Sequence, residues 1–104
     1  RDAEASASAL HAVGPTTAIV TLGADGLVIA DAADVERLAA FDVNSVSSHG
    51  AGDMFCGALA AEIAGGKTVR EACRFGAAAA ALAVSTPFEA RERMTESAVR
   101  NLIA

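Results

Sequence analysis

The chain has 104 residues and a formal net charge of −5, with 53% hydrophobic and 20% charged residues. This balance excludes a disordered tail, and an acidic chain without Trp or Tyr lacks the charge and the stacking platforms of a nucleic-acid binder. Its longest apolar run, residues 77–84, is far shorter than the roughly 20 residues that span a bilayer, and no secretory signal opens the chain. We therefore expect a cytoplasmic protein without nucleic-acid or membrane partners, comprising one small domain or part of a larger one.

The first half of the chain is predicted to form a helix and several strands. An alanine-rich stretch ends at a Gly-Pro helix stop, and two short β-branched runs flank a Gly-Ala-Asp-Gly turn. The flanked turn predicts a hairpin or a strand pair with a flexible corner. The expected elements are a helix over 2–13, strands over 18–22 and 27–30, a polar turn over 31–34, and a strand over 41–46 with 35–40 leading into it.

The second half is predicted to be helical. A small glycine-bearing loop, residues 47–53, precedes residues 54–64, which are apolar nearly all round and therefore predict a buried helix packed on a sheet. Thr68 and Glu71 have capping-box spacing and open a second helix to about Val84, and an amphipathic helix over 94–103 follows. Helices and strands in this order predict the α/β class, with too few strands for a complete sheet.

The loop before the helix has the composition of a phosphate site. Glycines let the main chain approach an anion, and the unpaired N–H groups of a first helical turn point at it. Gly50, Ala51 and Gly52 can supply these donors, and the carboxylate of Asp53, ionised at neutral pH, can take a proton from an attacking hydroxyl. From these four residues alone, a helix N-cap explains Asp53 equally well.

Two stretches at their spacing resemble the second signature of the ribokinase (PfkB) family of carbohydrate kinases. They are Thr-Leu-Gly-Ala-Asp-Gly at residues 21–26 and Gly-Ala-Gly-Asp-Met-Phe-Cys-Gly-Ala-Leu at residues 50–59. Residues 66–67 and 72–84 are similar to the helical segments that follow in that family. The resemblance covers roughly residues 12–86.

The resemblance implies a fold and an activity. The fold is α/β, the C-terminal part of a ribokinase-like kinase (Rossmann-like strands with packed helices), incomplete relative to a full kinase. Residues 1–104 would form its nucleotide-binding segment, with the N-terminal sugar-binding part and the lid absent, as in a cleaved or truncated product. Family members use Mg²⁺ and transfer the γ-phosphoryl group of ATP to the hydroxyl of a sugar or related small alcohol. The implied roles are Asp53 as the catalytic base, Gly50, Ala51 and Gly52 as the anion hole, and Thr21, Gly23, Gly26, Gly76 and Ala77 at the nucleotide.

The sequence also departs from the family pattern. Ser47 replaces an acid that usually helps to hold a monovalent cation, and Pro87 stands in the second part of that cation loop, so the resemblance does not extend to a potassium site. No residue of this chain is assigned to a metal. The alternative function is a non-catalytic kinase fragment that binds a nucleotide or only self-associates, as a homodimer or as a complement to the N-terminal part. Alone, the chain is expected to be inactive.

Three other features are given no site. Cys56 and Cys73 lack zinc-ligand spacing and are expected to be small core residues. Residues 91–93, Arg-Glu-Arg, are interpreted as a mixed-charge approach to a helix or a linker. His49, close to Asp53, is interpreted as a loop residue rather than a triad member, because triad members come from separate elements.

Overall fold

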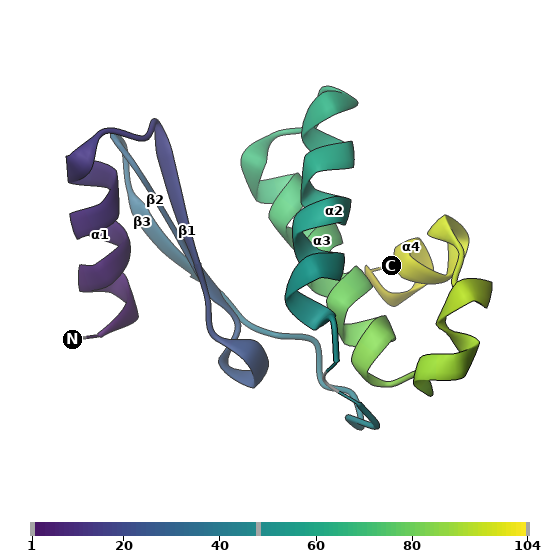
Figure 1. The fold of residues 1–104 in the computed structure, drawn as a ribbon. Helices are drawn as coiled ribbons and strands as arrows, with labels where there is room; N and C mark the ends of the chain where they lie inside the picture. The colour runs from purple at the N-terminus through teal and green to yellow at the C-terminus, as the bar shows by residue number, and fades with distance from the viewer. Residues whose placement is uncertain (1, 48, 104) are drawn as a thin grey trace. The chain divides into compact units, whose positions relative to one another are not determined.

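The computed structural model describes residues 2–47 and 49–103, with Phe88 by its backbone alone. It forms two compact units, Arg1–Ala40 and Phe41–Ala104, each of which is described by itself (Figure 1). Both helices and strands are present in the expected order, which confirms the α/β class. Within the described part of the chain, no helix is both long and apolar enough to cross a membrane.

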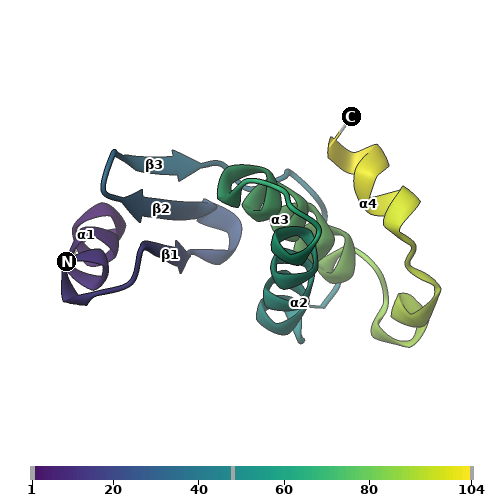
Figure 2. The ribbon, with the colours of Figure 1, turned by 90° about the horizontal axis from the view of Figure 1, so that it is seen from above.

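The first unit is one helix on a small antiparallel sheet. Helix α1 (Ala3–Val13) lies along one face of strands β1 (Thr17–Thr21), β2 (Leu27–Asp31) and β3 (Val35–Leu38), which pair in the order β1-β2-β3 (Figure 2). The expected hairpin between the first two strands is confirmed. The pairing is antiparallel rather than the parallel pairing of Rossmann-like strands, because connections of only a few residues cannot cross over to a parallel neighbour.

The core of this unit is small and its helix start is set by the sequence. Ala7 on the inner face of α1 packs against Val28 and Ala30 of β2, and all three are fully buried. The Asp2 side chain caps α1 by accepting a hydrogen bond from the Ala5 amide at 2.7 Å. The alanine surface lets the helix approach the sheet closely.

The third strand was expected in the wrong place. Asp31 makes a tight turn by accepting hydrogen bonds from the Ala33 and Asp34 amides at 2.8 and 3.0 Å. The strand begins directly after this turn, at Val35, and pairs with β2 in a register that opposes Leu38 to Leu27. Residues 41–46, expected to be a strand, carry no regular structure. An edge strand tolerates Glu36 and Arg37, and their polarity concealed it from a search for apolar runs.

The second unit is built from helices. Helices α2 (Ala51–Ala64) and α3 (Val69–Val84) lie side by side in both views, and α4 (Glu96–Ile103) packs on α3 after a 3₁₀ helix (Phe88–Arg93) (Figures 1 and 2). The predicted capping box and all three predicted helices are confirmed. The core consists of buried Ala78, Ala79 and Val99, and partly buried apolar residues pack around them: Phe41, Met54, Ala58, Phe75, Leu82, Leu102 and Ile103.

Helix α2 is much less buried than its apolar sequence predicts. Of its residues, Phe55 and Glu62 are buried, whereas Ile63 is 43% exposed. Cys73 is buried as expected, but Cys56 is exposed, so the prediction for that cysteine is wrong. Alanines and glycines dominate α2, and such small side chains remove too little apolar surface from water to force burial on every face.

Candidate functional site

The predicted anion hole is the first turn of helix α2. Gly50 is the N-cap residue and adopts the left-handed conformation, with φ 74° and ψ 8°, before the helix begins at Ala51. The sequence placed the helix start three residues later, so Ala51, Gly52 and Asp53 are helical rather than part of the loop. Left-handed backbone favours glycine, because a Cβ there meets the following carbonyl oxygen.

The first-turn amides are available to a ligand. The first hydrogen bond of the helix runs from the Met54 amide to the Gly50 carbonyl at 3.0 Å. Within the described residues, the amides of Ala51, Gly52 and Asp53 have no hydrogen-bond partner. Unpaired donors at a helix N-terminus, reinforced by the helix dipole, form a ready anion site.

Asp53 is exposed at the third position of this turn. Side chains of a helix tilt toward its N-terminus, so the carboxylate leans toward the end at which the free amides lie. Gly50, and not Asp53, is the N-cap, and no side-chain hydrogen bond caps this helix. The alternative explanation of Asp53 as an N-cap is therefore wrong.

Arg91 holds the segment that leads into this turn, and sequence reasoning missed it. Its Nε donates to the Ala83 carbonyl at 2.9 Å and its Nη2 to the Ser47 carbonyl at 2.8 Å, while Nη1 donates to the His49 carbonyl. The interpretation of residues 91–93 as a mixed-charge approach to a helix or a linker did not anticipate these hydrogen bonds of Arg91. Nothing in an Arg-Glu-Arg sequence distinguishes this arginine from a solvated one.

The same segment is joined to the end of α3 by its main chain. The Val84 carbonyl accepts hydrogen bonds from the amides of Val46 and Ser47, at 2.6 and 3.0 Å. The carbonyls of a last helical turn have no partner within the helix, and a cation is favoured there. The N-terminus of α2 and the C-terminus of α3 are thus connected through residues 46, 47 and 49 and through Arg91.

The predicted nucleotide residues Thr21, Gly23 and Gly26 lie in the β1–β2 connection, in the first unit. Thr21 and Gly23 are exposed, and the Gly26 carbonyl closes the turn by accepting from the Leu22 amide at 2.8 Å. Gly26 has φ 92°, and a Cβ added to it would lie 2.0 Å from the Leu38 carbonyl oxygen. The sheet alone therefore explains this glycine, and nucleotide contact by the turn stays a prediction.

Gly76 and Ala77, predicted near the adenine, lie in the middle of α3. Gly76 is buried, and a Cβ added to it would lie 3.0 Å from Cδ1 of Phe55 and 3.1 Å from the Phe55 carbonyl oxygen. Its small size lets α2 and α3 approach each other. Ala77 is half-buried. The contact with Phe55 explains Gly76 without a nucleotide. The role of both residues at the nucleotide stays a prediction.

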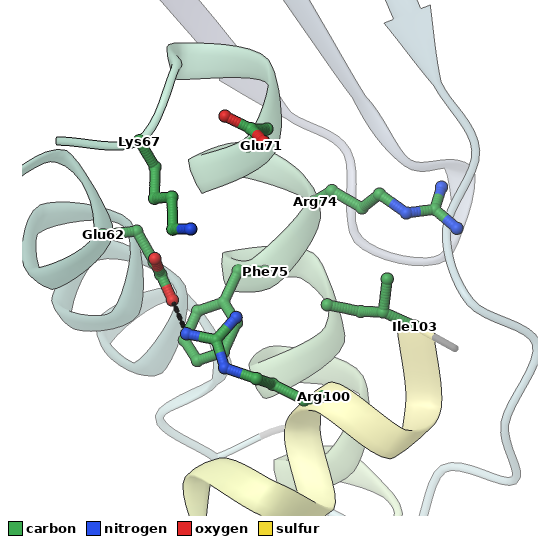
Figure 3. A pocket seen from close by; sticks show the side chains of 7 residues that line it. All are labelled: Glu62, Lys67, Glu71, Arg74, Phe75, Arg100 and Ile103. Carbon is green, nitrogen blue, oxygen red and sulfur yellow. Dashed lines mark hydrogen bonds and ion pairs between the residues drawn. The ribbon is translucent and has the colours of Figure 1, made fainter. Parts of the chain in front are cut away.

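A cavity of about 260 Å³ lies at the opposite end of α2 (Figure 3). Its lining residues are Glu62, Lys67, Glu71, Arg74, Phe75, Arg100 and Ile103. Glu62 lies nine positions after Asp53, which is about 13.5 Å along a helix. This cavity is therefore distinct from the anion hole.

Ion pairs occupy one side of this cavity. Arg100 donates to the buried Glu62 carboxylate at 2.5 Å and stacks over the Phe75 ring, 4.5 Å from its centroid (Figure 3). Hydrogen bonds to Glu96 and then Glu62 raise the pKa of Arg100 further. Glu62 and Glu96 thus neutralise this cation, while two further cationic side chains, Lys67 and Arg74, also line the cavity. Among the described residues, no cluster of three or more His, Cys, Asp or Glu could hold a metal ion.

Comparisons with known proteins place the chain among kinases. The family model described as pfkB family carbohydrate kinase matches residues 1–90. A ribokinase of Haemophilus influenzae is 35% identical over 80 residues, which are 77% of this chain and 26% of that protein. The chain thus spans about a quarter of the length of this relative.

Solved structures show the same similarity. The ribokinase of Thermotoga maritima matches with a TM-score of 0.85 and 31% identity, covering 96% of this chain and 34% of that one. Arabidopsis thaliana ribokinase complexed with ribose and ATP matches with a TM-score of 0.77 and 30% identity, covering 89% of this chain and 30% of that one. A ribokinase II of Escherichia coli in complex with ATP and Mg²⁺ has a TM-score of 0.86 at 24% identity, covering 99% of this chain and 33% of that one. This likeness supports the fold alone.

Proposed function

Because the chain belongs to the pfkB family of carbohydrate kinases, we propose that it supplies the anion hole and the catalytic base for phosphoryl transfer from ATP to the hydroxyl of a sugar or related small alcohol. The chain covers 26% of the Haemophilus relative and 34% of the Thermotoga structure. The proposal therefore concerns what these residues do within a kinase.

One observation carries the proposal. The left-handed turn at Gly50 opens α2 so that the Asp53 carboxylate belongs to the same helical turn as three amides that have no partner among the described residues. A carboxylate beside an anion site repels the anion, so its presence there calls for a separate chemical role. Accepting a proton from an alcohol is such a role, since the alcohol must lose its proton as it attacks the phosphorus.

Each group then has a distinct part in the reaction. The amides of Ala51 and Gly52, with that of Gly50, stabilise negative charge on the transferred phosphoryl oxygens without reorganisation during the reaction. Asp53 accepts the proton of the substrate hydroxyl. Mg²⁺, when bound with ATP, would neutralise further phosphate charge. The Thr21–Gly26 turn and the Gly76–Ala77 stretch are the proposed nucleotide contacts.

A second candidate function is nucleotide binding without transfer. The small share of the relatives that this chain spans favours it for the 104-residue chain by itself. Calorimetry with MgATP measures binding, and a coupled assay for ADP release with D-ribose measures transfer. Binding without ADP release would support this candidate for the isolated chain.

Substitution of the base tests the proposal in a kinase that contains this chain. Asp53→Asn keeps the size of the side chain and removes its basicity, so kcat should fall about 10²- to 10⁴-fold with ATP affinity nearly unchanged. Asp42→Asn makes the same chemical change at another exposed aspartate and should keep normal turnover. Turnover of Asp53→Asn above a few per cent of the unsubstituted enzyme, with the fold intact, would reject Asp53 as the base.

A further inference from the structure

We propose that Arg91 is a built-in cation that positions the segment leading into the anion hole. This inference rests on the proposed function for its consequence in catalysis, but the contacts that carry it do not. Arg91 lies outside the segments that carry the family resemblance, and its charge reaches residues more than forty positions earlier in the chain.

The first argument is the convergence of three main-chain carbonyls on one guanidinium. Ser47 and His49 supply two of them from the segment before Gly50, and Ala83 supplies the third from the last turn of α3. Carbonyl oxygens that gather in one place carry like partial charges and repel one another, and a positive charge among them removes this repulsion. The planar guanidinium donates in several fixed directions and so holds all three at once.

The second argument is the position of the charge. The side chain is half-buried, and a Cβ built on Gly50 would lie 3.6 Å from Nη1 of Arg91. The cationic group therefore lies directly against the residue that turns the main chain into α2. A displacement of His49 would move Gly50 and, with it, the direction of the first-turn amides of α2.

The chain itself thus supplies the cation that this carbonyl cluster requires. We therefore expect the segment to keep its geometry without a free alkali cation. Replacing potassium in the buffer by choline should leave the amide exchange of the unsubstituted protein unchanged. Faster exchange at Val46 and Ser47 in choline would contradict the proposal.

Amide exchange measured by NMR tests the role directly. The reporters are the Val46 and Ser47 amides, bonded to Val84, and the Met54 amide, bonded to Gly50. In Arg91→Ala these amides should exchange about 10- to 100-fold faster, because hydrogen bonds to a charged donor are lost. The matched control is Arg93→Ala, which removes the same charge from an exposed residue of the same 3₁₀ helix and should leave them within about threefold.

Chemical rescue separates a positioning cation from a general loss of packing. Guanidinium at millimolar concentration, far below denaturing levels, should restore slow exchange in Arg91→Ala. Arg91→Lys keeps the charge but presents one nitrogen instead of a fork. Its amide exchange rates should lie between those of the unsubstituted protein and those of Arg91→Ala. If Arg91→Ala loses its circular dichroism, Arg91→Lys carries the comparison by itself. Unchanged exchange in both variants, an equal effect of Arg93→Ala, or no response to guanidinium would overturn the proposal.

The kinetic consequence distinguishes this inference from the assignment of the base. In a kinase that contains this chain, Arg91→Ala should lose kcat and regain part of it with guanidinium, whereas guanidinium should not help Asp53→Asn. The exchange measurement uses neither ATP nor a sugar. It therefore stands or fails independently of whether Asp53 accepts the proton.

Discussion

Substitution of Gly26 should strongly destabilise the first unit, and the structure gives the size of the effect. A Cβ at this position would lie 2.0 Å from the Leu38 carbonyl oxygen, whereas ordinary contact begins at 3.4 Å, so the strand end must move by about 1.4 Å. Such a shift breaks a hydrogen bond, at about 1 kcal/mol each. With φ 92° and ψ −141°, the backbone is also in a region open almost only to glycine, which adds about 1–3 kcal/mol.

Gly26→Ala should therefore lower the free energy of unfolding of the first unit by about 3 kcal/mol, measured by urea denaturation with circular dichroism. Gly23→Ala is the matched control in the same turn. Gly23 also has a positive φ, 58°, but a Cβ there meets nothing within 4 Å, so only about 1–2 kcal/mol is expected. If both variants lost the same stability, the close approach of β3 to Gly26 would not be the cause.

Two further predictions concern the second unit. Hydrogen bonds from the Thr68 amide and then from its hydroxyl lower the pKa of Glu71, so the stability that they contribute is present above the ordinary glutamate pKa of about 4.3 and is lost as the pH falls through the lowered value. Thermal melts from neutral to acidic pH should show a smaller loss of stability for Glu71→Gln than for the unsubstituted chain. Glu92→Gln is the control. Identical curves for Glu71→Gln and the unsubstituted chain would contradict the capping box as a source of acid sensitivity. Burial raises the pKa of Cys73 to about 11, whereas Cys56 is exposed. Iodoacetamide at about pH 8.5 should therefore alkylate Cys56 first, which peptide mass spectrometry can measure. Faster labelling of Cys73 would contradict its burial.

Local signals in the sequence predicted most of the helices. The Thr68 and Glu71 pair predicts a helix start because both groups of a capping box lie within one turn, and Gly14 and Pro15 stop α1 for equally local reasons. The Gly-Ala-Gly-Asp motif predicted both the family and the candidate base, since a helix start and a phosphate site use the same unpaired amides. The start of α2 was placed three residues late, because a first turn of small residues looks like a loop in sequence.

Features that depend on distant parts of the chain could not be predicted in this way. The strand β3 was missed because its pairing with β2, and not its own composition, makes it a strand. For Gly26 and Gly76 the resemblance implied a nucleotide contact, which stays a prediction, and nothing local indicated the Leu38 carbonyl and the Phe55 side chain that the structure places against them. Small residues look alike in a sequence, whatever it is that approaches them.

The sequence by itself determined that this chain is of the α/β class, where α1, α3 and α4 lie, and that it resembles a kinase family, because each of these depends on residues close together in the chain. The tertiary structure alone decided which of the two arginines at positions 91 and 93 is bonded to distant main-chain carbonyls. Arg91 contacts segments around residues 47 and 83, and only folding brings those carbonyls within reach of one side chain.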